Sequence, residues 1–259
     1  MSGETSVLKR VGAVLNGFSD RRPQLTLADL ATLLEASEAT AYRYAAELCD
    51  IGLLARRAGH FLPGPKIIEL DYLIQSYDPV LRAGTSAMAA IAERTGCHVL
   101  LCAVYGQGLV NVHHAVGRQP LALTFLRGRT MPLFRGSQAR VALAFTPTRK
   151  LRRLWATHRD DPDLARLGAD WLALRRTLQA VRKAGHYISR GELDPGITGI
   201  AAPLLGEDAT LLGCLVLAYA ADQPPTGDEA ALAATVMAEA RAISDRLGLQ
   251  RAGPPQADG

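Results

Sequence analysis

The chain has 259 residues, of which 48% are hydrophobic and 21% charged, and its formal net charge at pH 7 is +4. This length fits one large or two ordinary domains with a well-filled core, and no apolar run of about 18 residues occurs that would predict a membrane span. The first ten residues lack the apolar stretch of a signal peptide, so we expect a cytoplasmic protein. Its four cysteines form no CxxC pair and are predicted to be buried thiols.

Residues 1–65 are predicted to form a winged helix-turn-helix domain that begins with three helices. An apolar stripe from residue 7 to residue 18 indicates the first helix. Thr26 is placed to cap a second helix, in which apolar residues recur at helical spacing up to Leu34. Ser37 is a good N-cap for a third helix that runs to about Cys49. A helix in this position fits the major groove of DNA.

A short hairpin follows the third helix. Leu53–Arg56 and His60–Leu62 have the pattern of two strands around a turn at residues 57–59, and Leu25 is placed to pair with them. Such a wing carries basic side chains toward phosphates. The candidate DNA contacts are the exposed residues of the third helix and the wing: Ser37, Glu38, Thr40, Tyr42, Arg43, Arg56, Arg57 and His60.

Arg43 is the leading candidate for reading a base, because an exposed arginine early in a recognition helix can form two hydrogen bonds with guanine. The alternatives for Arg43 are a solvated charge or a phosphate contact. Arg56, Arg57 and His60 are predicted to meet phosphates. The basic residues in this part of the chain are local to the third helix and the wing rather than in overall excess. The helix-turn-helix pattern is therefore stronger evidence for DNA binding than the net charge.

A linker helix is predicted over residues 66–78, and its apolar face suits packing either between protomers or on its own domain. Residues 79–248 then have a mixed pattern that predicts an α+β domain with an antiparallel sheet. Its expected helices cover residues 79–95, 137–145, 148–155, 170–184 and 228–247, with a surface loop at 160–163. Its expected strands cover residues 97–105, 109–115, 121–126, 187–192, 199–205 and 211–218. Residues 249–259 are predicted to be a disordered tail.

Several motifs resemble the IclR family of bacterial transcriptional regulators. In the N-terminal part they are Thr40–Arg43, Asp50–Leu53 and Phe61–Pro65. Gly185–Tyr187, Gly191–Glu192 and Gly199–Pro203 are similar to the effector-domain signature of that family, and their order and separation fit. The resemblance covers roughly residues 6–247. The chain departs from the family at Glu35, where the turn usually has glycine, and at Ala139–Arg140, where the family has Gly-Lys.

The resemblance implies a GAF-like effector domain that binds a small metabolite, with organic acids, many of them aromatic or central carboxylates, among the usual effectors. The best candidate in the residues themselves is Arg135, Gly136, Ser137 and Gln138, because a glycine-containing loop that opens a helix presents N–H groups that suit a carboxylate. An ordinary N-cap is the alternative. By resemblance, the rest of the pocket would come from three segments, with Leu121, Leu123, Phe125, Asp194, Ile197, Gly199, Cys214 and Leu217 as candidates.

No cofactor is expected, because the chain contains neither a P-loop nor a GxGxxG motif. Adjacent strand residues face opposite sides of a sheet, so His113 and His114, or Cys97 and His98, are not expected to share a metal ion. Glu192 and Asp194 form a possible acid pair, but no nucleophile motif such as GxSxG accompanies them, and they are expected to orient the pocket loop. We therefore predict neither a metal site nor an enzyme.

The sequence favours a ligand-responsive transcriptional regulator that binds a near-palindromic, double-stranded DNA operator as a dimer. The family resemblance also allows a dimer of dimers. The alternative is a small-molecule hydrolase or transferase with an N-terminal assembly domain, which a nucleophile and a base within hydrogen-bond reach would favour. A third possibility is an architectural DNA-binding protein whose C-terminal domain has a filled core and only dimerises.

Overall fold

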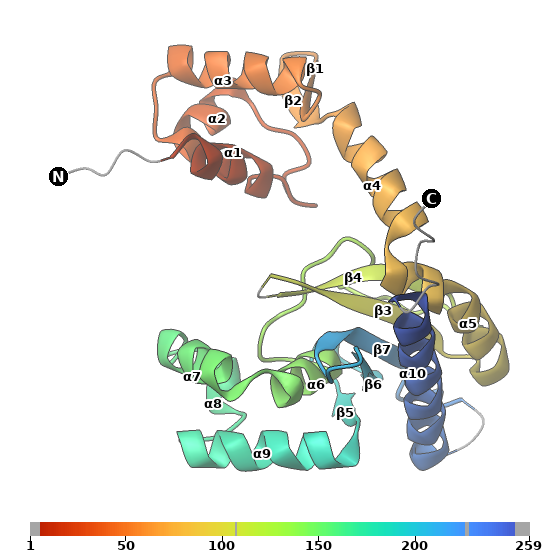
Figure 1. Ribbon diagram of the computed structural model, residues 1–259. Helices are drawn as coiled ribbons and strands as arrows, with labels where there is room; N and C mark the ends of the chain where they lie inside the picture. The colour runs from red at the N-terminus through yellow and green to blue at the C-terminus, as the bar shows by residue number, and fades with distance from the viewer. Residues whose placement is uncertain (1–5, 107, 226–227, 252–259) are drawn as a thin grey trace, which may run out of the picture. The chain divides into compact units, whose positions relative to one another are not determined.

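Figure 1 shows the computed structural model, which describes residues 6–106, 108–225 and 228–251. The chain divides into two compact units, residues 1–77 and residues 78–259. The first unit has one hydrophobic core, and the second has two, one on each face of its sheet. Within the described ranges, no helix is long and apolar enough to cross a membrane.

The first unit is a winged helix-turn-helix followed by one further helix, as the sequence predicts. Its elements are α1 (Val7–Asn16), α2 (Leu27–Leu34), α3 (Glu38–Asp50), β1 (Leu54–Arg57), β2 (His60–Pro63) and α4 (Pro65–Tyr77). Strands β1 and β2 pair in antiparallel register, and Leu25 forms an isolated bridge with Phe61. This bridge attaches the wing to the segment before α2, as expected from the position of Leu25.

Local hydrogen bonds fix the ends of the two helices that form the helix-turn-helix. The Thr26 hydroxyl accepts the Asp29 N–H at 3.1 Å, and the Asp29 carboxylate accepts the Thr26 N–H at 2.8 Å, which together make a capping box. Helix α2 ends at Glu35, which adopts the left-handed conformation with φ 50° and ψ 47°. The turn therefore has the backbone that favours glycine, although the residue there is glutamate.

The third helix is held to the core by one face. Ala41, Ala45 and Leu48 are buried against a cluster that includes Leu30 and Phe61. Helix α4 differs, because none of its residues is buried. Its large apolar side chains are all exposed: Ile67, Ile68, Leu70, Tyr72, Leu73, Ile74 and Tyr77.

The second unit is built on a five-stranded antiparallel sheet with the strand order β4-β3-β7-β6-β5. The strands are β3 (His98–Tyr105), β4 (Gly108–Ala115), β5 (Tyr187–Arg190), β6 (Ile197–Leu205) and β7 (Leu211–Ala220). The central strands β3 and β7 place Cys102 opposite Cys214. Both faces of the sheet are covered by helices, so its middle strands are apolar along almost their whole length.

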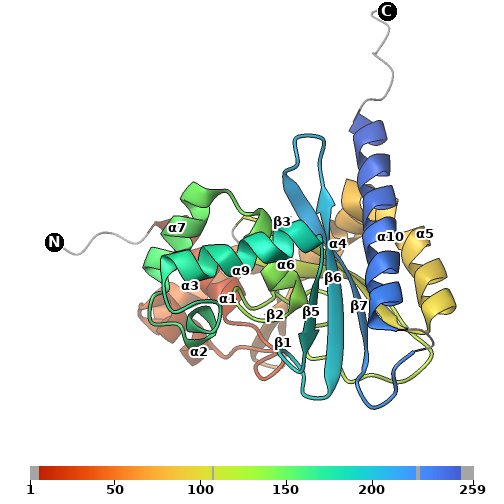
Figure 2. The same cartoon turned by 90° about the horizontal axis from the view of Figure 1, so that it is seen from below.

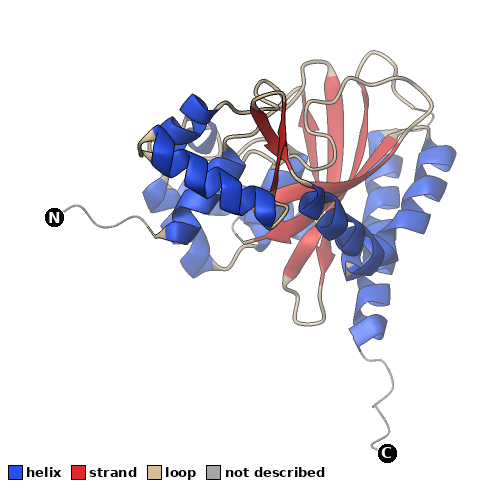
Figure 3. Cartoon of the chain, turned by 90° about the horizontal axis from the view of Figure 1, so that it is seen from above, coloured by secondary structure: helices blue, strands red, loops and turns tan. Residues whose placement is uncertain are grey.

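Figures 2 and 3 show how the helices cover the sheet. Helices α5 (Pro79–Thr95) and α10 (Glu229–Arg251) pack on one face, in a core with Ile200, Leu215 and Leu217. The other face carries α6 (Ser137–Phe145), α7 (Thr148–Thr157), α8 (Pro162–Ala165) and α9 (Trp171–Ala184), whose buried leucines share one core. Gly96 and Gly185 end α5 and α9 in the left-handed conformation, as the sequence predicts.

Three predictions for the second unit are wrong. Residues 121–126 are not a strand: the Thr124 N–H is bonded by the Asp194 side chain, and the Phe125 carbonyl accepts from the Asn111 amide, so side chains replace a partner strand. The predicted loop at 160–163 contains the start of α8. Helix α10 continues to Arg251, so residues 249–251 of the predicted tail are helical, while residues 252–259, like Gly227, lie outside the described residues.

Candidate DNA interface and ligand cavity

The exposed face of α3 carries the residues predicted to meet DNA. Tyr42 has 49% of its surface exposed, and Glu38 and Arg43 are exposed on the same helix. Ser37 and Thr40 are used differently, because the Ser37 hydroxyl accepts the Thr40 N–H at 3.3 Å and donates to the Thr40 hydroxyl at 3.1 Å. These two residues therefore fix the start of the helix, while Tyr42 and Arg43 are available for contact.

Arg56 connects the wing to α3. Its guanidinium lies over the Tyr42 ring at 5.7 Å and over the Phe61 ring at 5.8 Å from the centroids. A guanidinium stacked on a ring keeps its in-plane N–H donors for another acceptor, and phosphate matches their spacing. Arg57 is exposed on the same strand. The His60 ring bonds the Ala58 carbonyl through Nδ1 at 3.1 Å, so in the neutral ring Nε2 has no hydrogen to donate.

One contact of this unit has no clear signal in the sequence. Arg10 in α1 donates to the Tyr44 hydroxyl at 3.2 Å, and its guanidinium lies 5.8 Å from the centre of that ring. The two side chains are 34 positions apart, so only the folded arrangement of α1 and α3 brings them together. This contact supports α3 from the side opposite the exposed Tyr42.

A small cavity of about 40 Å³ lies in the second unit between the sheet, the start of α6 and the loops at 121–126 and 191–196. Seven of the predicted ligand residues line it: Leu123, Phe125, Ser137, Gln138, Asp194, Ile197 and Gly199. The lining also contains five residues without a signal in the sequence: Leu100, Ser189, Leu193, Val216 and Ala218. The cavity is therefore mainly apolar, with two hydroxyls, one amide and one carboxylate.

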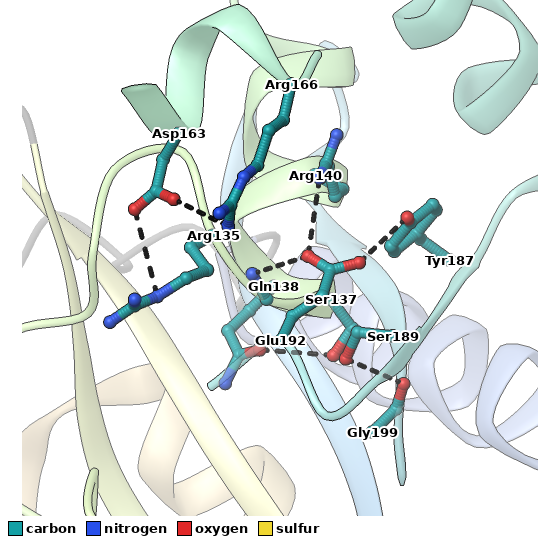
Figure 4. A network of polar contacts seen from close by, with 11 residues as sticks. Arg135, Ser137, Gln138, Arg140, Asp163, Arg166, Tyr187, Ser189, Glu192 and Gly199 are labelled. Carbon is teal, nitrogen blue, oxygen red and sulfur yellow. Dashed lines mark hydrogen bonds and ion pairs between the residues drawn. The ribbon is translucent and has the colours of Figure 1, made fainter. Parts of the chain in front are cut away.

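The start of α6 is organised around an internal carboxylate, as Figure 4 shows. Glu192 accepts the Gly136 N–H at 3.0 Å and the Tyr187 hydroxyl at 2.9 Å, and it pairs with Arg140 at 3.4 Å. The Arg140 guanidinium also lies 5.4 Å from the centre of the Tyr187 ring. The Gly136 N–H at the helix N-terminus is thus already occupied by the protein, whereas the N–H groups of the first helical turn have no partner within the helix.

Five of the predicted ligand residues lie outside this cavity. Arg135 points to α8, with its Nε 3.8 Å from an Asp163 carboxylate oxygen, and Gly136 is used by Glu192 (Figure 4). Leu217 faces the opposite core, because side chains alternate along β7 and Val216 and Ala218 face the cavity. Cys214 shares their face but lies under α6, with its sulfur 3.8 Å from the Gln138 carbonyl oxygen. Leu121 lines a neighbouring cavity of about 170 Å³.

A glycine and a hydrogen-bonded pair shape the cavity. A Cβ on Gly199 would lie 3.1 Å from the hydroxyl oxygens of both Ser137 and Ser189, so glycine leaves room for these two groups. Asp194 accepts the Thr124 N–H at 3.2 Å and forms a short hydrogen bond with the Thr124 hydroxyl. This pair holds the 121–126 segment against the β5–β6 loop at the edge of the cavity.

His98 and three cysteines of this unit, Cys97, Cys102 and Cys214, are buried in the packed structure. His98 lies 2.9 Å from His114 between their ring nitrogens, and its Nε2 donates to the Gln119 carbonyl at 2.6 Å. Burial and the neighbouring His98 lower the pKa of His114. Burial raises the pKa of Cys102 to about 12, so this thiol is not an activated nucleophile. Among the described residues, no three metal-ligating side chains gather in one place.

A winged helix followed by a separate sheet domain is the architecture of a transcriptional regulator with a DNA-binding unit and a second, effector unit. Comparison with family models agrees: the IclR helix-turn-helix domain matches residues 7–58, and the bacterial transcriptional regulator IclR C-terminal domain matches residues 74–245. The chain belongs to the IclR family. It is a transcriptional regulator with a DNA-binding helix-turn-helix and an effector domain.

Its relatives are distant in sequence and similar in fold. The regulator KipR of Bacillus subtilis is 24% identical over 213 residues, which cover 80% of this chain and 83% of KipR. A solved IclR regulator from Silicibacter has a TM-score of 0.78 at 22% identity and covers 94% of this chain and 96% of its own. An IclR homolog from Microbacterium hydrocarbonoxydans, solved with 4-hydroxybenzoate, has a TM-score of 0.76 at 23% identity. The match covers 96% of this chain and 100% of the homolog.

Proposed function

We propose that this protein binds a near-palindromic operator as a dimer and that a small organic acid in the second unit controls this binding. The observation that carries the proposal is the exposed face of α3, where Tyr42 and Arg43 are free of the core and Arg56 stacks beside them. A helix held by three buried residues and capped by Ser37 is rigid enough to enter a major groove.

Helix α4 supports assembly as a dimer. None of its residues is buried against the described part of the chain, and Ile68 has 74% of its surface exposed. Exposed apolar patches of this kind mark interaction sites. Two copies that bury α4 against each other would bring two winged helices to two half-sites, which raises specificity over a single one.

The lining of the cavity supports a small carboxylate with an apolar or aromatic body. The first N–H groups of α6 and the Ser137 hydroxyl are suited to the acid, and Leu123, Phe125 and Val216 to the body. The Microbacterium relative was solved with an aromatic hydroxy acid, which fits the same description. An engineered cavity that holds benzene has about 150 Å³, so the cavity of about 40 Å³ must open at the Thr124–Asp194 contact.

The DNA contact is tested by comparing two arginine variants on the operator and on random duplex. Arg43→Ala should lose roughly 1–3 kcal/mol on the operator alone, because it removes a base contact. Arg57→Ala should weaken both duplexes equally and flatten the salt dependence, because it removes a phosphate contact. If Arg43→Ala binds the operator as the wild type does, α3 does not read bases through this residue.

The cavity is tested by titration of candidate acids into variants of Ser137. Ser137→Ala should weaken binding by about 0.5–1.5 kcal/mol, or up to roughly 3 if the hydrogen bond is charge-assisted. Ser137→Trp should fill the cavity and abolish binding while operator binding persists. Thr235→Ala on α10 is the matched control, since it removes a hydroxyl far from the cavity. Unchanged affinity in Ser137→Trp would place the ligand elsewhere.

The dimer is tested by sedimentation of Ile68→Glu. A charge in the centre of a buried α4 interface should shift the protein toward monomer. Leu172→Glu is the control, because Leu172 on α9 is also largely exposed but lies outside α4. Equal sedimentation of the two variants and the wild type would argue against α4 as the interface.

A further inference from the structure

The positive charge of this regulator is concentrated in the second unit. Residues 1–77 contain eight basic and nine acidic residues, a net charge of −1, although they include the winged helix. Residues 148–184, which hold α7, α8 and α9, contain ten basic and four acidic residues, a net charge of +6. Since the whole chain carries +4, this one segment accounts for more than its entire excess of positive charge.

The acidic residues of this segment do not neutralise the arginines of α7 and α9. Asp161 caps α8, and Asp170 caps α9 by accepting the Ala173 N–H at 2.8 Å. Asp163 pairs with Arg166 and faces Arg135. The basic residues on the outer faces of the two long helices have no ion pair with any described residue: Arg149, Arg152, Arg153, Arg175, Arg176, Arg182 and Lys183.

These helices are fixed on the sheet and present the arginines to solvent. Leu151 and Leu154 of α7 and Leu174 and Leu178 of α9 are buried in one cluster. Figure 2 shows both helices on the side of the sheet opposite α5 and α10. The arginines are exposed, so a partner can reach them without a change in the fold.

Aromatic rings orient three of the guanidinium groups. Arg152 lies 5.2 Å from the centre of the Trp171 ring, which connects α7 to the start of α9. Arg159 lies 5.5 Å from the Trp155 ring, and Arg182 lies 5.2 Å from the Phe145 ring. Stacking on a ring limits the freedom of a guanidinium but leaves its N–H donors accessible, which lowers the entropy lost on binding a phosphate.

We propose that the basic face of α7 and α9, defined by the seven unpaired residues named above, binds the phosphate backbone of duplex DNA. DNA is the polyanion that this regulator meets, and its phosphates match arginine forks. A protein partner fits less well, because Leu172 is the only large exposed apolar residue of the described part of this segment, and protein interfaces need an apolar centre. A second copy of the same face would oppose positive charge with positive charge.

The test compares two double variants of the full-length protein on a long random-sequence duplex, with binding measured over a salt series. Arg153→Gln/Arg176→Gln removes one arginine from each helix, and neither side chain stacks on a ring. Arg82→Gln/Arg241→Gln removes the same charge from the exposed surfaces of α5 and α10 on the other face of the sheet. Each lost phosphate contact makes the negative slope of log K against log salt shallower by about 0.9. The slope of the first variant should therefore be shallower than that of the wild type by about 1.8, and the slope of the second should be nearly unchanged.

Equal slopes in the two double variants would overturn the proposal. Arg43→Ala and Arg57→Ala separate this outcome from a failure of the winged helix, because they act on DNA binding through the first unit. Polyglutamate is the second probe. If Arg153→Gln/Arg176→Gln weakened binding of polyglutamate but not of DNA, the face would serve an acidic protein, and the DNA assignment would be wrong. Tryptophan fluorescence verifies that both variants are folded, since Trp155 and Trp171 lie in this segment.

Discussion

The helices that carry the two candidate binding surfaces, α3 in the first unit and α6 in the second, each follow a residue with positive φ, but the two residues differ in burial. Before α3 it is Glu35, with φ 50° and an exposed side chain. Before α6 it is Gly136, with φ 93° and buried. A Cβ on Gly136 would lie 2.6 Å from Leu193 Cδ1, whereas the Glu35 side chain extends into solvent. A residue with positive φ at the surface costs only backbone strain, while a buried one must also fit its neighbours.

The largest expected effect is that of Gly136→Ala. Gly136 has φ 93° and ψ 164°, a backbone region almost confined to glycine, which costs about 1–3 kcal/mol for a residue with a Cβ. Forcing the methyl against Leu193 adds about 1–3 kcal/mol. Urea unfolding followed by tryptophan fluorescence reports this, because both tryptophans lie in the second unit. Gly128→Ala is the control: its φ is 83°, and a Cβ there meets nothing within 4 Å. Equal losses in the two variants would show that Leu193 does not restrict this position.

Ser37→Ala tests the helix start of the first unit. It removes the acceptor of the Thr40 N–H, and loss of such a cap costs about 1 kcal/mol. Hydrogen exchange of the α3 amides measures the change, because the first unit contains no tryptophan. Thr235→Ala, which removes a hydroxyl within α10, should leave these amides unchanged. Faster exchange in both variants would contradict a local role for Ser37.

Glu35→Gly should stabilise the first unit. The substitution relieves left-handed backbone, which is worth up to about 1 kcal/mol, less the extra entropy of glycine in the unfolded chain. Slower hydrogen exchange of the α2 and α3 amides would show this gain in stability. Ala58→Gly is the matched comparison, because Ala58 has φ 49° in the exposed turn of the wing. A loss of stability in Glu35→Gly would mean that the glutamate makes a contribution that outweighs its strain.

The smallest expected effect is a pH response confined to the second unit. Burial, His98 and His113 lower the pKa of His114 below its ordinary value of 6.5. A base with a lowered folded pKa stabilises the fold above the unfolded pKa, and this contribution is lost as the pH falls through the folded pKa. Tryptophan-monitored stability should therefore fall below about pH 6.5, and His114→Gln should reduce the slope. An unchanged slope in that variant would assign the response to another group.

Short-range patterns explain why most of the fold was predictable. The Thr26 and Ser37 caps, the hairpin of the wing and the glycine stops of α5 and α9 each depend on residues a few positions apart. The segment at 121–126 was predicted wrongly because its alternating leucines resemble a strand. Its hydrogen bonds are made by Asn111 and Asp194, which are distant in sequence.

The candidate site likewise combines features that follow from neighbouring residues with features that depend on residues distant in sequence. Ser137, Gln138, Asp194 and Gly199 were selected from the helix start and the family resemblance, and the structure brings them to one cavity. Leu217 lies outside this cavity, because a shift of one residue along a strand moves a side chain to the opposite face. Arg135 could not be placed from its position before α6, since its direction depends on Asp163 in α8.

The sequence by itself determined the two-domain plan, the helix-turn-helix and the family, because caps, turns and periodicity are encoded by neighbouring residues. Only the tertiary structure decided which carboxylate occupies the start of α6, which face of β7 lines the cavity and where the unpaired arginines of α7 and α9 lie. These features depend on side chains that meet from distant parts of the chain. Their positions follow from packing, which local sequence does not contain.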